Sequence, residues 1–223
     1  MPEETIDVVG TGGDGHNTLN IQRRYIQVFH LGGLGGLPYV GPTGFNMMAS
    51  HVPDDGHVFL MYASNLGWDA ESGSIGKVRR RGQSELSLCS GVASEALAAL
   101  KLNPNDITSG MLDHQMGIVK QLLSPSLSDI VHDDPNRENA NLSFAMYHVI
   151  RLYLEQTLNT NWMGPNSKLV ILGGIILNRS EVGADAFQPL SFEMRDKKGN
   201  KTDMFEKTFG VEPWRLLPNK KKN

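Results

Sequence analysis

A glycine-rich loop near the start of the chain has the composition of an anion-binding site. Residues 10–15 read GTGGDG and follow residues 6–9 (IDVV), whose mostly apolar side chains are typical of the start of a short strand. Glycines let a ligand approach the backbone closely, so that several N–H groups can face one phosphate. Arg23 and Arg24 are the nearest basic side chains that could complete such a site. The chemistry indicated by this loop alone is phosphate binding.

Over residues 5–21 the sequence resembles the diphosphate-binding loop of anthranilate phosphoribosyltransferases. The resemblance ends there, because nothing after Gln22 resembles the acceptor site or the metal-binding carboxylates of those enzymes. We therefore interpret residues 1–21 as a glycine-rich leader joined to a different domain, exposed and adding little to the core. A phosphoribosyl-diphosphate-binding module is the alternative.

The central segment, residues 30–82, is expected to build the functional site. Five glycines and two prolines lie within residues 32–42 and exclude a regular helix or strand there, so this part is a compact loop. Residues 57–64 (HVFLMYAS) form a short apolar run between turn residues, the pattern of a strand covered on both faces. Ligands bind in the crevice at the carboxyl ends of such strands, so residues 62–69 are expected there.

The residues that could bind a metal are few. Cys89 is the only cysteine, and a predicted helix over residues 84–102 would place it in the first turns, where a helix N-terminus stabilises a thiolate. We interpret His51, His57 and His114 as surface or hydrogen-bonded histidines, and the basic run over residues 77–81 as a solvated face.

Several motifs of the remaining chain resemble the limiting-CO2-inducible B/C proteins of algae and their microbial relatives. In order they are GGLGGLPYVGPTGF, ASHVPDDG, YASNLGWD, GSIGKVRRRG, LGGIILN and FQPLSFEMRDKKG, and the resemblance covers about residues 22–199. That family is similar in fold to the β-type carbonic anhydrases. The resemblance implies an α/β fold: a single αβα domain with a mostly parallel central sheet, over residues 22–210, followed by a basic tail at residues 211–223. It also implies CO2 and bicarbonate as ligands, and a homodimer or a hetero-oligomer with related subunits.

The resemblance further implies a zinc site in which two cysteines and one histidine leave an open position for water. Cys89 stands at the second cysteine position and Asn65 at the histidine position. The first cysteine, in a Cys-x-Asp-x-Arg motif, is absent, and Asp14 is the nearest carboxylate that could act as the catalytic residue. Because an asparagine amide is a poor zinc ligand, we predict a degraded metal site with weak or no activity. The alternative is an active carbonate dehydratase whose true N-terminus carries the missing motif.

Hydrophobic periodicity predicts the elements that position these residues. Residues 168–177 form a central strand broken by a glycine pair, and residues 187–195 form an edge-type strand with Pro189 near its start. The apolar runs 57–64 and 168–177 are expected to be adjacent parallel strands, covered by the helices over 84–102 and 140–158. The predicted helices cover residues 22–29, 84–102, 113–123, 139–158 and 204–208.

Composition limits the function classes. A formal net charge of -3 over 223 residues argues against a general nucleic-acid binder, because phosphate affinity depends on clustered Lys and Arg. No apolar run approaches the roughly 18 residues of a membrane span, so a soluble protein is expected. A single cysteine excludes an internal disulfide. By family resemblance the location is the chloroplast stroma for an algal protein, and the cytoplasm otherwise.

Overall fold

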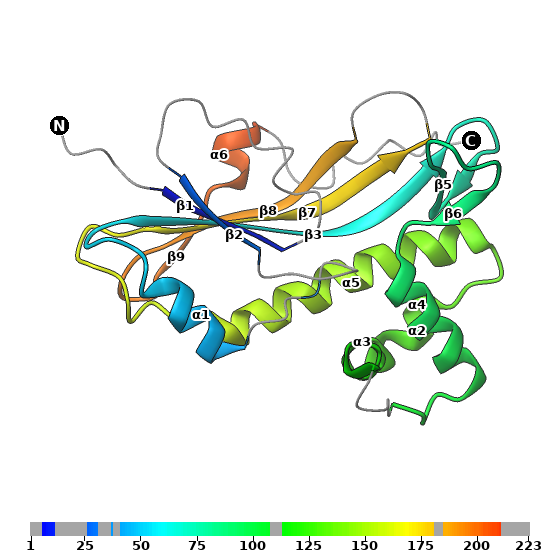
Figure 1. Ribbon diagram of the computed structural model, residues 1–223, viewed down its shortest axis with the longest axis horizontal. Helices are drawn as coiled ribbons and strands as arrows, with labels where there is room; N and C mark the ends of the chain where they lie inside the picture. Colours follow the sequence, from blue (N-terminus) through cyan, green and yellow to red (C-terminus); the bar gives the residue numbers. More distant parts are fainter. Residues whose placement is uncertain are drawn as a thin grey trace.

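The computed structural model describes residues 6–11, 26–30, 37, 41–107, 113–180 and 185–210. It has the expected α/β class, with one mixed sheet and helices on both of its sides. Figure 1 shows the helices α1 (Pro42–Ala49) and α5 (Pro135–Thr157) below the sheet and α6 (Phe205–Phe209) above it. The strands lie in the order β2 (Ile26–His30), β1 (Ile6–Thr11), β3 (His57–Asp69), β7 (Leu169–Arg179), β8 (Ala186–Arg195) and β9 (Lys201–Asp203), with the short β4 (Ser74–Ile75) beside β3.

The two long strands β3 and β7 form the centre of the sheet. They pair in parallel along the whole of β7, which confirms the prediction of adjacent parallel strands. The prediction that glycines break β7 is wrong: the strand is continuous, and only its register with β8 shifts, between Gly173 and Gly174. A Cβ at Gly173 would lie 2.2 Å from Cζ of Tyr62. Glycine is therefore needed there to admit the tyrosine ring.

The N-terminal segments differ from the sequence-based expectations. Strand β1 pairs in parallel with β2 on one side and with β3 on the other, so residues 6–11 belong to the sheet and the expectation of a leader outside the core is wrong for this segment. Residues 26–30 form β2, although residues 22–29 are predicted to be helical. Strand pairing, a non-local interaction, outweighs the weak helical spacing of this short apolar segment.

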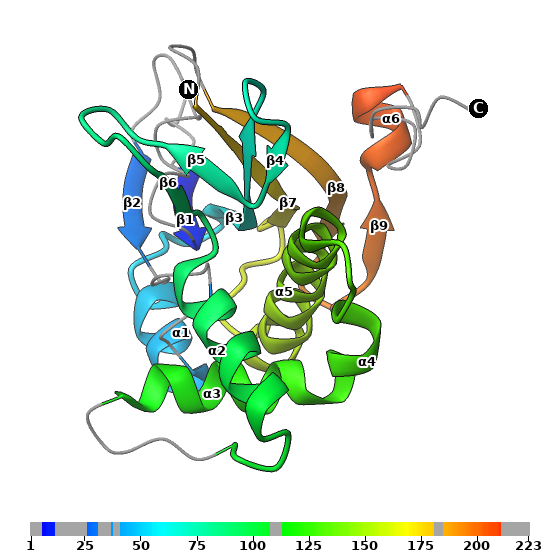
Figure 2. The same cartoon turned by 90° about the vertical axis from the view of Figure 1, so that its right-hand side faces the viewer.

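Helix α5 covers the sheet and joins two hydrophobic clusters. It begins at Pro135, four residues before the predicted start, because Asp134 caps it by accepting a hydrogen bond from the Asn136 N–H. Its buried face packs on β3 and β7 in a first cluster, which includes Tyr147 and Ile150. Leu142 and Met146 belong to the second cluster, beside α2 (Gly91–Leu102), α3 (His114–Leu123) and α4 (Leu127–Ile130). Figures 1 and 2 show these three helices gathered beyond α5, away from the sheet.

Part of the predicted helix over residues 84–102 is a strand. Residues Leu86–Leu88 form β6, which pairs with β5 (Lys77–Arg79) in a separate two-stranded hairpin. Helix α2 starts at Gly91, so Cys89 precedes the helix and does not lie in its first turns. The helix packs on α3 and α5, so the prediction that it covers the sheet directly is also wrong. The helix predicted over residues 113–123 is confirmed as α3.

The C-terminal strands complete the sheet in antiparallel orientation. Strand β8 pairs with β7 over its length but with β9 only from Glu193 to Arg195, so the rest of β8 has the predicted edge character in the described structure. None of the helices described is both long and apolar enough to cross a membrane.

Candidate functional site

The candidate site lies where β3 passes under α5 and the start of α2. The backbone carbonyl of Asn65 accepts hydrogen bonds from two hydroxyls, Ser90 Oγ at 3.2 Å and Ser143 Oγ at 2.8 Å. The Ser64 hydroxyl donates in turn to the Ser143 carbonyl, at 2.7 Å. Ser64 and Ser143 are almost fully buried, so these bonds tie β3 to α5 away from water.

The turn between β4 and β5 is clamped against the N-terminal part of α5. Asn139 Nδ2 donates to the Ile75 carbonyl at 2.8 Å, and the Ile75 N–H donates to Asn136 Oδ1 at 2.9 Å. The next residue, Gly76, has a φ of +91°, and a Cβ there would lie 2.4 Å from Asn139. Only glycine permits this close approach of the turn to the helix.

The same turn positions Cys89. The Cys89 N–H donates to the carbonyl of Gly76 at 3.0 Å, and the following residue, Ser90, contacts the Asn65 carbonyl. The structure thus places the half-buried Cys89 and Asn65 in one neighbourhood, although they lie on different elements. Asp14, the third residue expected at the site, lies outside the described residues.

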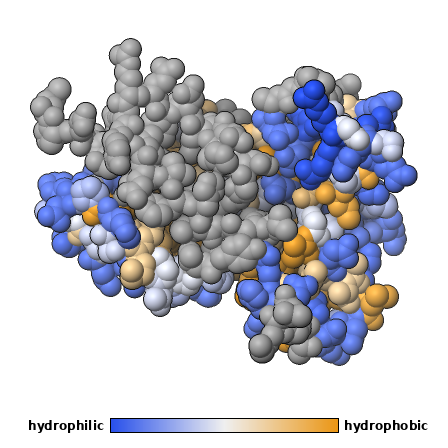
Figure 3. Space-filling model, viewed as in Figure 1, coloured by the Kyte–Doolittle hydropathy of each residue, from blue (hydrophilic) through white to orange (hydrophobic). Residues whose placement is uncertain are grey.

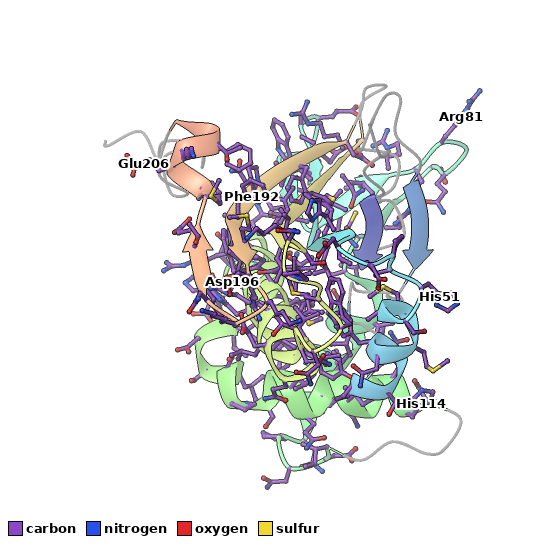
Figure 4. The ribbon with its side chains drawn as sticks, turned by 90° about the vertical axis from the view of Figure 1, so that its left-hand side faces the viewer. His51, Arg81, His114, Phe192, Asp196 and Glu206 are labelled. Carbon is purple, nitrogen blue, oxygen red and sulfur yellow. The ribbon has the colours of Figure 1, made fainter. Side chains whose placement is uncertain are left out.

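The donor set present does not fit a zinc site of two cysteines and one histidine. Within the described ranges no group of three histidine, cysteine, aspartate or glutamate side chains could hold a metal ion. The His51 ring contacts the Met47 carbonyl at 2.9 Å, and His57 Nδ1 accepts from the Lys168 N–H at 3.0 Å. Figure 4 shows His51 and His114 apart from each other at the outside of the molecule.

A buried polar cluster between the sheet and α5 is a feature that sequence reasoning missed. The Tyr62 hydroxyl lies 3.1 Å from Ser191 Oγ and 3.5 Å from the Tyr147 hydroxyl, and the two tyrosine rings are stacked. Burial raises the pKa of Tyr62, and the neighbouring Tyr147 raises it further, so this phenol stays protonated. The adjoining cavity, about 10 Å³, has room for no more than one water. The cluster therefore serves the packing of α5 on the sheet and offers no binding site. In the sequence, the glycine pair at 173 and 174 is the feature that indicates such close packing.

Comparison with known proteins gives matches over most of the chain. A family model described as limiting CO2-inducible proteins B/C, beta carbonic anhydrases, matches residues 16–196. The crystal structure of PtLCIB4, a homolog of the limiting CO2-inducible protein LCIB, is similar with a TM-score of 0.74 and 27% identity, covering 90% of this chain and 84% of that one. A histidine-to-alanine mutant of PtLCIB4 matches with a TM-score of 0.75 and 27% identity, over 90% of this chain and 82% of that one. LCIB itself shares the fold at 16% identity and a TM-score of 0.61, covering 89% and 82% of the two chains. No curated protein sequence matches.

Proposed function

Since the chain belongs to the family of limiting CO2-inducible proteins B/C, beta carbonic anhydrases, we propose that it is a carbonic-anhydrase-like protein linked to CO2 and bicarbonate handling, with a degraded zinc site and weak or no hydration activity. The observation that carries the proposal is the donor set. Cys89 is the only cysteine among 223 residues, and the neighbouring β3 residue is Asn65, whose amide is a poor ligand for zinc. A site with two thiolates cannot form within one subunit.

The hydrogen bonds around Cys89 support the proposal that the chain keeps the structural framework of the family's site although metal ligands of that site are missing. The clamp by Asn136 and Asn139 and the hydroxyl contacts to the Asn65 carbonyl join three elements through hydrogen bonds of the chain itself. We propose that this scaffold acts through bicarbonate binding, or through assembly into a homodimer or a hetero-oligomer with related subunits. A chloroplast stromal location, if the source is an alga, is part of the same proposal.

The test measures metal and activity on the same preparation. We expect purified protein to carry well under one zinc per chain by elemental analysis and to hydrate CO2 at a rate close to that of buffer. The matched control is Ser87→Ala, on β6 near Cys89. Stoichiometric zinc that Cys89→Ser removes and Ser87→Ala keeps, together with zinc-dependent hydration, would establish the alternative of an active carbonate dehydratase.

A second candidate, phosphoribosyl-diphosphate binding, is favoured by the position of β1. This strand lies inside the parallel part of the sheet, and its carboxyl end leads directly into the glycine-rich residues 12–15. A strand followed by a glycine loop is the usual layout of a phosphate site. Calorimetric titration with phosphoribosyl diphosphate tests it: micromolar binding that the double variant Arg23→Ala/Arg24→Ala abolishes would favour this candidate.

A further inference from the structure

An open pocket lies beside the β5–β6 hairpin, at the carboxyl ends of β3 and β7. Its volume is about 800 Å³, and its walls are residues 78–83 of the hairpin, residues 178–180 after the core of β7, and Asp185. The Arg79 N–H donates to Ser180 Oγ at 2.8 Å, and the Ser180 N–H donates to the Trp68 carbonyl at 3.2 Å. These bonds join the two walls, so the pocket is a built part of the fold.

Arginine side chains dominate the charge of this pocket. Arg79, Arg80 and Arg179 line it, and Arg81 projects from the hairpin in Figure 4. In Figure 3 the surface at the upper right, over β5 and β6 in Figure 1, is strongly hydrophilic. The basic residues thus come from two segments about a hundred positions apart in sequence and converge on one concave surface. From the sequence we interpret residues 77–81 as a solvated basic face. Such a face would not need a further arginine from β7 on the same concave surface.

Among the described residues, three carboxylates lie near the pocket and compensate part of this positive charge: Glu71, Asp185 and Asp69, the last of which is hydrogen-bonded to Ser180 and interacts with Arg79. Glu71 pairs with Arg79 at 3.4 Å, but both side chains are well exposed, so the pair is weak. Asp185 accepts hydrogen bonds from the Arg179 backbone N–H at 3.1 Å and from Asn178 Nδ2 at 3.0 Å, which orients its carboxylate toward these neutral donors. In the described part of the chain four arginines are therefore set against three carboxylates, and the remaining positive charge favours an anion.

The ligand chemistry follows from the guanidinium groups and the size of the pocket. Guanidinium presents a planar fork of donors that matches phosphate oxygens in pairs. Pockets for organic ligands measure roughly 300–1,000 Å³, so 800 Å³ leaves room for an organic group besides the phosphate. Trp68 is 42% exposed, and Cζ of Arg179 lies 5.7 Å from its ring centroid, so an aromatic side chain adjoins one of the arginines that line the pocket. We propose that this pocket binds a small molecule carrying a phosphate group, held by Arg79, Arg80 and Arg179.

The full chain is titrated with three probes: inorganic phosphate, ribose 5-phosphate and ADP. Binding is measured by isothermal titration calorimetry at low salt and at 0.15 M salt. We expect at least one phosphate ester to bind more tightly than inorganic phosphate. The double variant Arg80→Ala/Arg179→Ala should weaken that binding at least tenfold. A charge-matched control, Lys197→Ala/Lys198→Ala in the exposed β8–β9 turn, should stay within about twofold of the wild type.

Two further variants keep the result decisive. Arg80→Lys/Arg179→Lys preserves the charge, and it should fold normally and retain part of the binding, which separates ligand contact from a folding defect. A preference for ADP that Trp68→Leu removes would place the organic group on the aromatic surface. The proposal is overturned if no probe binds below about 1 mM at low salt, if the alanine double variant binds like the wild type, or if only Arg23→Ala/Arg24→Ala abolishes binding.

Discussion

Replacing Gly173 by alanine should destabilise the protein through a single identifiable clash. An ideal Cβ at this position would lie 2.2 Å from Cζ and 2.4 Å from the hydroxyl oxygen of Tyr62, and 2.6 Å from Ser191 Oγ. Ordinary contacts of a Cβ begin near 3.4 Å, so the tyrosine would have to move by about 1 Å. The ring is only 2% exposed and is stacked on Tyr147, with 5.6 Å between centroids, so little space is available for that movement.

The magnitude follows from two opposing effects. Overpacking of a close-packed core costs typically 1–3 kcal/mol, and a clash with a confined ring belongs near the upper end, about 3 kcal/mol. Removing a glycine from the unfolded chain returns about 0.4–1 kcal/mol. The net loss in the free energy of unfolding is therefore about 2 kcal/mol, which for a chain of this length corresponds to a decrease in Tm of roughly 4–8 °C.

Urea unfolding monitored by circular dichroism measures this loss. The control is Gly91→Ala at the start of α2, where nothing lies within 4 Å of the position that the new methyl group would take, so the stability should not fall. In a Tyr62→Leu background, which lacks the two nearest clashing atoms and leaves only the hydroxyl of Ser191 close by, the Gly173→Ala substitution should cost less than half as much. A free energy of unfolding within about 0.5 kcal/mol of the wild type, or an equal cost in both backgrounds, would refute the reasoning.

Two other predictions concern the residues around the candidate site. Hydrogen bonds from Ser180 and then Ser72 lower the pKa of Asp69 from 3.8 to about 2, so its stabilising contribution is present above about pH 4 and is lost as the pH falls toward 2. Asp69→Asn should therefore lower the free energy of unfolding at pH 7 and reduce its decrease between pH 4 and pH 2, as measured by urea unfolding; an unchanged decrease would contradict this. Asn139→Ala removes the bond to the Ile75 carbonyl, at a cost of about 1 kcal/mol, and should speed hydrogen exchange of the Cys89 amide, whereas Asn105→Ala should not. Equal exchange rates in both variants would show that the clamp does not position Cys89.

Local pattern was sufficient for the long elements. The apolar runs of β3 and β7 and the amphipathic α3 and α5 are all recognisable in the sequence, because burial on one or both faces leaves a periodic or continuous apolar signal. Apolar periodicity predicts the start of α5 four residues late, because the helix begins at a capping residue, Asp134, rather than at an apolar residue. Boundaries depend on a few hydrogen bonds and so are less visible than periodicity.

Short segments depended on partners distant in the chain. Residues 26–30 have apolar residues at helical spacing, yet they form β2 because β1 offers a parallel edge. Residues 86–88 precede a true helix and share its composition, yet they pair with β5. Neither choice is visible locally, since a segment of three to five residues is stabilised mainly by the strand that it pairs with.

For the candidate site, the sequence by itself determined the chemistry available: one cysteine, Cys89, an asparagine at position 65, and a basic run over residues 77–81. The tertiary structure decided which of these groups meet. It places Ser90 against the Asn65 carbonyl, and Arg179 across one pocket from Arg79 and Arg80. Residue types belong to single positions, whereas a site needs groups from several elements to converge. That convergence follows from the pairing of β3 with β7 and from the packing of the hairpin and α5 against them.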